Sequence, residues 1–367
     1  MKRATVESDS NKLNNLLSRL LLMPRHNASA MAELEADVVH LDRGQFTNLV
    51  DLACTNHVVV RAIGTLRDIE SKAGDPTRTA WADTAIAAER SRRDNAVSLL
   101  ASICKEFNEH QKPIVVIKSL DHWPDLGSDL DLYTDANPAD VIQLMKQRFG
   151  ATVAPRSWGD RLAGKWNFII PELPELVEIH VGRLGQTGEQ SAFSASLIRR
   201  SRHFLINDIS FRVPSSSDRL VISTLQRMYR HFYFRLCDIV DSASLVESDS
   251  IDYADLRDIA ASAGIWEGVA TYLAIVSDYV ARFRGASLDL PHWVVLAARF
   301  GARDVYFAKD FLRIPIMPQS ALLYGSQVAC ALRRRQLHSG VRLSLLPWLA
   351  TAALVGQKIT GSDKGIW

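Results

Sequence analysis

Two aspartates one residue apart, Asp129 and Asp131, constrain the fold of this chain more than any other feature. Polar and apolar residues alternate over Asp129–Leu132, which predicts a β-strand. Side chains two apart share one face of a strand, so both carboxylates point the same way while Leu130 and Leu132 face the core. Two like charges so close are costly unless a cation lies between them, and Mg²⁺ prefers carboxylate oxygens together with substrate phosphates.

Two further segments have a strand-like pattern. The apolar run Ile114–Ile117 predicts a short buried strand, and a turn rich in Asp, Pro and Gly separates it from Asp129. Farther along, the alternation in Leu176–Val181 puts Glu178 and His180 on one face of a strand and apolar side chains on the other. The chain therefore offers a second acidic strand.

Together these motifs resemble the nucleotidyltransferase superfamily that includes DNA polymerase beta, in which a strand ending in a small residue is followed by Asp-hydrophobic-Asp-hydrophobic. More specifically, residues 85–290 resemble an uncharacterised bacterial nucleotidyltransferase family with a Leu-Lys-Gly motif, paired acids, an acidic-x-His strand and a helical tail. Lys118 matches the family's lysine, and Ser119 stands where the family usually has glycine. The chain lacks the arginine that relatives often carry just before the acidic pair.

The resemblance implies a catalytic metal site. The superfamily expects a third carboxylate on a neighbouring strand, so Glu178 is predicted to join the paired aspartates as a ligand. Glu172 and Glu175 are the alternatives if the register differs by a residue or two. His180 is expected to orient Glu178 rather than to bind the metal, because hard cations prefer oxygen ligands.

The resemblance also implies nucleotide-binding residues next to the acids. The hydroxyl and backbone N–H of Ser119 are predicted to bind a terminal phosphate oxygen at a helix start, with Ser128 nearby. Lys118 is predicted to add a positive charge near the phosphates. Its alternative is a surface ion pair with Asp121 or Asp125.

The implied chemistry is nucleotidyl transfer with Mg²⁺ (or Mn²⁺) and a nucleoside triphosphate such as ATP. In sites of this kind two metal ions about 3.5–4 Å apart clamp the phosphates. Asp129 and Asp131 are expected to bridge both ions, and Glu178 to hold the ion that activates the attacking hydroxyl and to act as its general base. The product is an acceptor that carries a nucleoside monophosphate.

One predicted helix carries a cluster of cations. Ser217 and Asp218 form a plausible cap before a helix over Leu220–Val240. Helical spacing lets its basic residues form one stripe aimed at triphosphate, and the cleft is then expected between the sheet and this helix. The alternative, which we favour slightly, is an ordinary charged helix with an Arg235–Asp238 salt bridge. The basic residues are Arg227, Arg230, His231 and Arg235.

Composition restricts the partners and the compartment. The net charge of +2 gives no strong nucleic-acid signal. Four scattered cysteines show no paired metal spacing and lie in apolar surroundings, which favours buried free thiols in a reducing cytoplasm. No signal peptide is predicted. The charges over Glu89–Asp94 are interpreted as a solvated helix face.

The predicted fold is α+β, with a small mixed nucleotidyltransferase-type sheet between helical regions. The predicted divisions are an N-terminal helical region (1–110), a catalytic core (111–213) and a C-terminal helical domain (214–367). The apolar segment 343–356 is too short to span a bilayer as a helix. It is expected to be a buried helix, with weak contact to a membrane interface as the alternative.

Three classes of function compete. The first is an enzyme that transfers a nucleoside monophosphate to a hydroxyl of a small molecule. The second is a toxin-like transferase that acts on protein or tRNA. The third is a binding protein that keeps the fold and has lost the chemistry, and the missing arginine before the acidic pair is the reason to retain it.

Overall fold

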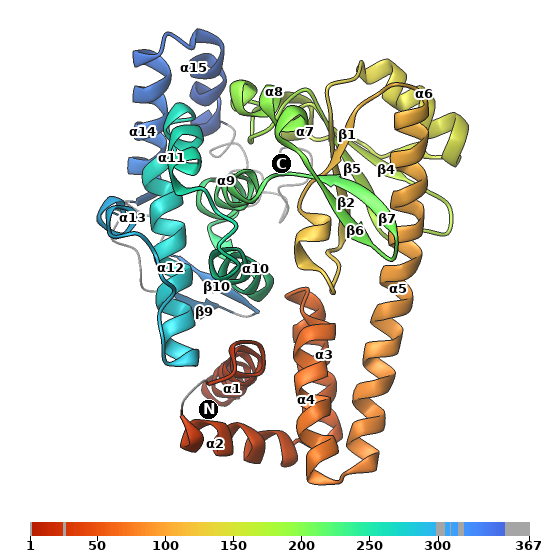
Figure 1. Cartoon of the computed structure of the whole chain (residues 1–367), viewed down its shortest axis with the longest axis vertical. Coiled ribbons are helices and arrows are strands. Elements are labelled where there is room, and N and C mark those ends of the chain that lie inside the picture. Colours follow the sequence, from red (N-terminus) through yellow and green to blue (C-terminus); the bar gives the residue numbers. More distant parts are fainter. Residues whose placement is uncertain (1, 25–26, 299–304, 309, 315–318, 349–367) are drawn as a thin grey trace.

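The chain folds as an α+β protein, with N-terminal helices, a mixed five-stranded sheet and a C-terminal helical region (Figure 1). The computed structural model describes residues 2–24, 27–298, 305–308, 310–314 and 319–348. The N-terminal helices are α1 (Lys2–Leu22), α2 (Ala28–Val39), α3 (Arg43–Thr55), α4 (Val59–Ala73) and α5 (Pro76–Glu109).

The break between α4 and α5 follows from local chemistry. Gly74 ends α4 in the left-handed conformation, at φ 78°, where a side chain would be strained. Asp75 then caps α5 by accepting hydrogen bonds from the backbone N–H groups of Thr77 and Arg78, and Pro76 fills the first helical position. The prediction of N-terminal helices is confirmed.

The central sheet has the order β1-β2-β5-β4-β3. Strands β2 and β5 are parallel, whereas the other neighbours are antiparallel. Helix α6 (Pro138–Phe149), which Asn137 caps, and helix α7 (Trp158–Ala163) lie in the long connection from β2 to β5. The strands are β1 (Ile114–Val116), β2 (Asp129–Thr134), β3 (Thr152–Val153), β4 (Lys165–Ile169) and β5 (Leu176–Val181).

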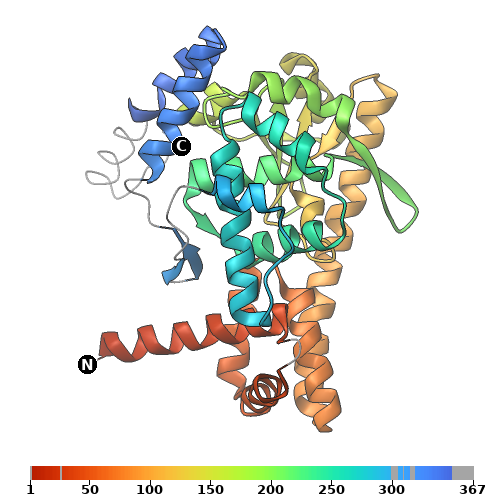
Figure 2. The same ribbon diagram turned by 60° about the vertical axis from the view of Figure 1, so that its left-hand side comes forward.

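A two-stranded hairpin follows the sheet. Helix α8 (Ser191–Arg200) leads into β6 (Arg202–Ile206) and β7 (Ile209–Val213), which pair only with each other among the described strands. Asn207 and Asp208 form the turn with positive φ, a conformation these residue types tolerate well. The hairpin projects from the body of the molecule (Figure 2).

The predicted single helix over Leu220–Val240 is wrong. Helix α9 (Ser216–Gln226) runs into a π-helical turn (Arg227–His231) and then breaks at Phe232, whose φ is 54°. The aromatic residues that follow favour an extended backbone, and β8 (Tyr233–Phe234) pairs with β10 (Phe311–Arg313). The chain resumes as α10 (Leu236–Glu247).

The described elements of the remaining C-terminal region are helices and a small sheet of order β8-β10-β9, which the sequence did not predict. No described helix is long and apolar enough to cross a membrane. In the segment 343–356, α15 ends at Ser344 and Leu343 is buried, whereas 349–356 lies outside the described residues. The remaining elements are α11 (Tyr253–Ser262), α12 (Trp266–Arg284), α13 (His292–Ala297), β9 (Tyr306–Ala308), α14 (Gln319–Arg333) and α15 (Leu337–Ser344).

Two hydrophobic clusters hold these elements together. One joins helices α1 to α4 and the first half of α5 to α9, α10, α11 and α12, so the N-terminal and C-terminal helices share a core. The other joins the second half of α5 to the sheet, α6 and β7. The 34-residue helix α5 therefore connects both clusters. Val115 of β1 and Tyr133 of β2 also belong to the first cluster, so this edge of the sheet packs into the core that the helices share.

Candidate active site

Strands β2 and β5 bring two of the predicted acids together. Asp131 and Glu178 are direct partners in the parallel register, so both side chains leave the same face of the sheet. Asp129 lies two residues before Asp131 on that face and lines the same cavity of about 200 Å³. Glu175 and Glu172, the alternative ligands, do not line this cavity, and Glu175 pairs with Arg92 instead.

Two lysines compensate the charge of the buried carboxylates. The Lys118 ammonium contacts Asp131 and lies 3.8 Å from Glu178 Oε1, so it sits between two acids. Lys165 Nζ lies 2.5 Å from Glu178 Oε2. The alternative partners of Lys118 are ruled out because Asp121 pairs with Arg219 and Asp125 with Arg61. Lys165 was missed because its significance depends on β4 pairing with β5.

His180 occupies the predicted position beside Glu178. Its Nε2 lies 2.7 Å from Glu178 Oε1, and both residues are buried. Asp131, Glu178 and His180 form a group whose ligand atoms all lie within 4.8 Å of one another. Asp129 is not part of that tight group, and within the described residues the one hydrogen-bond partner of its carboxylate is Ser128 Oγ, at 3.5 Å.

The backbone at Lys118 and Ser119 is unusual. Lys118 has φ 64° and ψ −54°, and the N–H of Ser119 donates to the Ile117 carbonyl across it, at 2.7 Å, which is the geometry of a strained γ-turn. The Ser119 hydroxyl accepts from the N–H of Asp131 at 2.7 Å and is buried. Both predicted phosphate donors of Ser119 are thus engaged with the backbone. Ser119 instead fixes the turn against β2.

Basic residues of the π-helical turn, together with Arg235 just before α10, line the same cavity as the acids. Arg227, Arg230, His231 and Arg235 all line it, together with Lys118 and Lys165. Asp238 pairs with Arg227, Nε to Oδ2 at 2.7 Å, and accepts from the Arg235 backbone N–H. The expected Arg235–Asp238 salt bridge is therefore replaced by an Arg227–Asp238 pair. Arg227 Nη1 is buried with no hydrogen-bond partner among the described residues.

Helix α5 holds the turn that precedes Asp129. Arg92 donates to the carbonyls of Leu126 and Gly127, at 3.0 and 3.2 Å, and pairs with the buried Glu175. Arg93 donates to the Pro124 carbonyl at 3.1 Å. The interpretation of these two arginines as part of a solvated face is wrong. Their role was not visible in the sequence because their partners lie more than thirty residues away.

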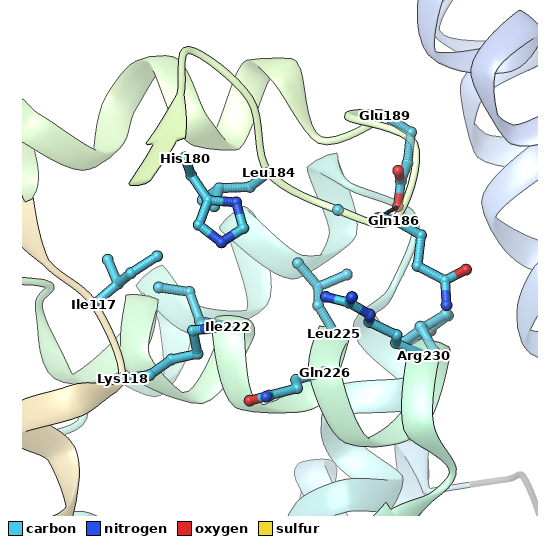
Figure 3. A pocket seen from close by; sticks show the side chains of 12 residues that line it. Ile117, Lys118, His180, Leu184, Gln186, Glu189, Ile222, Leu225, Gln226 and Arg230 are labelled. Atoms are coloured by element: carbon cyan, nitrogen blue, oxygen red, sulfur yellow. Dashed lines mark hydrogen bonds between the residues drawn. The ribbon is translucent and has the colours of Figure 1, made fainter. Parts of the chain in front are cut away.

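A smaller, more apolar pocket of about 60 Å³ adjoins the acidic cavity (Figure 3). His180 points into it opposite Ile117 and Lys118, and Arg230 lies at its other end. Ile222 and Leu225 of α9 supply apolar surface. Lys118, Gln226 and Arg230 line both spaces, which therefore lie side by side.

The surroundings raise the pKa of Asp131 and lower the pKa of Glu178. Burial raises the pKa of the Asp131 carboxyl, and the nearby Glu178 carboxylate adds to this rise while Lys118 opposes it. Burial also penalises ionised Glu178, but Lys118, His180 and Lys165 outweigh it and hold the pKa of Glu178 well below its usual range. Glu178 is therefore a stable anion and a poor general base.

No protein-family model matches the chain, and a search of curated proteins found no match.

Proposed function

We propose that this protein is a metal-dependent nucleotidyltransferase that moves a nucleoside monophosphate from a nucleoside triphosphate to a hydroxyl. The observation that carries the proposal is the pairing of Asp131 with Glu178 on adjacent parallel strands, with Asp129 in the same cavity and four basic residues opposite. Acids on one wall suit a divalent cation, and cations on the other suit phosphate oxygens.

The carboxylates fit a hard cation. The Lys118 ammonium already lies against Asp131 and Glu178, so positive charge is favourable at this point. Asp129, Asp131 and Glu178 would hold Mg²⁺ or Mn²⁺, which would offset the phosphate charge when bound. Asp129 is the least constrained of the three because Ser128 Oγ, at 3.5 Å, is its only side-chain contact among the described hydrogen bonds.

The reaction follows from this arrangement. The acceptor oxygen attacks the α-phosphorus, the bond from that phosphorus to the β-bridging oxygen breaks, and pyrophosphate leaves with the electron pair. The hydroxyl proton passes to a cavity carboxylate or to water. Arg227, Arg230 and Arg235 bind phosphate oxygens, and the apolar pocket at Ile222 and Leu225 takes an apolar part of the nucleotide or of a small acceptor. Ser128 contributes a hydroxyl at the cavity rim.

The location of the label tests the reaction type. The protein is incubated with Mg²⁺, a cell extract and a triphosphate labelled on either the α- or the γ-phosphate. The proposal predicts acceptor labelling from the α-phosphate alone, with release of pyrophosphate, and loss of labelling in Asp131→Asn but not in the exposed hairpin variant Asp208→Asn. Labelling from the γ-phosphate would refute it. A labelled protein or tRNA would identify the macromolecular version of the acceptor.

A catalytically inactive binding protein is the second candidate, and one observation favours it. Lys118 and Lys165 together already compensate Glu178, so the acidic group is satisfied without a metal. This version predicts nucleotide binding that is indifferent to Mg²⁺ and no transfer of label. Cys104 and Cys237 are buried as expected, whereas the expectation of a buried thiol is wrong for Cys54, which is exposed. Free thiols fit the cytoplasm, where we place either version.

A further inference from the structure

A second group of metal-binding side chains lies in the wall of the acidic cavity, and it is separate from the three carboxylates. His57 lies between α3 and α4, His122 ends the 3₁₀ turn Ser119–His122, and Cys237 is in the first turn of α10. One ligand atom from each residue lies within 4.8 Å of the others. His57 and His122 line the cavity, whereas Cys237 lies behind them and is fully buried.

We propose that His57, His122 and Cys237 form a zinc site whose fourth position opens toward the cavity. Two imidazoles and a thiolate are the donor set that Zn²⁺ prefers and that Mg²⁺ does not. Cys237 Sγ lies 3.9 Å from His122 Nε2, close to the ~3.6 Å expected between a sulfur and a nitrogen bound to one tetrahedral Zn²⁺. Three protein ligands leave one position for water or a substrate atom.

The surroundings of His122 are those of a metal ligand. Asp241 Oδ2 lies 2.5 Å from His122 Nδ1, which puts the proton on Nδ1 and leaves the Nε2 lone pair directed at Cys237. Asp241 stands four residues after Cys237, so both are on one face of α10. Arg61 fixes Asp241 in turn, with Nη1 2.6 Å from Oδ1.

His57 is held in place, yet its Nδ1 has no hydrogen-bond partner among the described residues. Its backbone has φ 55°, and its neighbour Asn56 accepts hydrogen bonds from the backbone N–H groups of Leu236 and Cys237. This ties the loop of His57 to the start of α10. His57 is nine-tenths buried, and its Nδ1 has no hydrogen-bond partner within the described ranges. A metal would satisfy the imidazole, which burial otherwise leaves at a cost.

The same residues do not suit a thiol nucleophile. Cys237, His122 and Asp241 form a Cys-His-Asp sequence of contacts, but Cys237 is 0% exposed and does not line the cavity. A substrate carbon cannot reach this sulfur, whereas an ion entering between the two histidines can. The zinc proposal does not depend on nucleotidyl transfer, because its ligands are not those of the acidic site.

Cobalt titration of the metal-stripped full chain tests the proposal. We expect one tetrahedral Co²⁺ per chain, with intense d–d bands and a thiolate-to-cobalt charge-transfer band, and displacement of both by one equivalent of Zn²⁺. Cys237→Ala should lose the charge-transfer band, while Cys104→Ala, which removes a buried thiol from the other cluster, should keep it. Asp241→Asn should weaken zinc binding about 10–100-fold.

Two results would overturn it. One is a wild-type spectrum without tetrahedral or charge-transfer bands, which requires no variant to fold. The other is stoichiometric zinc binding that is equal in wild type, Cys237→Ala and His57→Ala, with circular dichroism showing that all three are folded. Mg²⁺ binding is measured separately, so failure at the acidic site would leave the zinc result intact.

Discussion

Lys118 is the residue on which the acidic cavity depends most. Its ammonium lies between Asp131 and Glu178, two buried carboxylates that would otherwise repel each other. The strained backbone at Lys118 is a second sign that its position is enforced by the surroundings. In the proposed enzyme the bound Mg²⁺ and the Lys118 ammonium would neutralise the same two carboxylates.

Replacing Lys118 should make the free energy of unfolding depend on Mg²⁺. Lys118→Met leaves Asp131 and Glu178 without the shared cation, and breaking a buried pair in this way costs about 3 kcal/mol of unfolding free energy. Added Mg²⁺ should restore much of the loss, because the ion neutralises the same carboxylates. Urea denaturation with chelator and with Mg²⁺ measures both effects.

A surface pair provides the control. Lys112 pairs with Asp140 where both side chains are partly exposed, so Lys112→Met should change stability by at most about 0.5 kcal/mol, with no response to Mg²⁺. If Mg²⁺ stabilises the two variants equally, the ion does not bind at Asp131 and Glu178.

Among the individual site residues, the sequence predicted those whose placement depends only on the alternation of side chains along one strand. Asp129 and Asp131 share a face, and Glu178 shares its face with His180, because the period of a strand is two. Lys165 and the histidines of the proposed zinc site were missed. Their roles arise from strand pairing and from loops far apart in the chain, and no local spacing encodes those.

Helix α5 supports the turn that precedes Asp129. Arg92 binds the carbonyls of Leu126 and Gly127 and the buried Glu175, all outside its own helix. The turn from Leu126 to Ser128 therefore takes its position from α5, and Asp129 follows directly.

Removing that contact should loosen the turn. Arg92→Ala leaves Glu175 buried without its cation, and we expect a loss of about 2 kcal/mol in unfolding free energy together with weaker nucleotide binding. Arg90→Ala, on an exposed position of the same helix, should stay within about 0.5 kcal/mol. Equal stability and equal nucleotide affinity in the two variants would contradict this role of α5.

Local sequence patterns are enough to predict helix ends, but not the break of a helix by a distant strand. Helix ends marked by Gly74, Asp75 and Asn137 were predictable because a cap is a local interaction. The helix expected over Leu220–Val240 is interrupted because Tyr233 and Phe234 pair with β10, about eighty residues later.

The N-terminal helices and the C-terminal helices share one of the two hydrophobic clusters. Leu17 of α1 is fully buried in the cluster that also contains α12, and Ser18 Oγ lies 2.7 Å from Tyr279 Oη. The N-terminal helices are therefore expected to unfold together with the C-terminal helices, although the sequence suggested separate regions. A sequence pattern identifies an apolar face but not its partner.

A core substitution in α1 tests this coupling. Leu17→Ala should lower the unfolding free energy by about 3 kcal/mol while leaving one cooperative transition. Leu205→Ala, in the exposed hairpin at 69% exposure, should have little effect. Tryptophan fluorescence and far-ultraviolet circular dichroism should give coincident urea curves. Separate transitions for the two probes would show that the helical regions fold independently.

Calorimetric titration with a non-hydrolysable nucleoside triphosphate tests the central claim most directly. The account predicts binding that requires Mg²⁺ or Mn²⁺ in the wild type, is lost in Asp129→Asn and Asp131→Asn, and persists in Asp208→Asn. Metal-independent binding, or no binding in a folded wild-type protein, would contradict it.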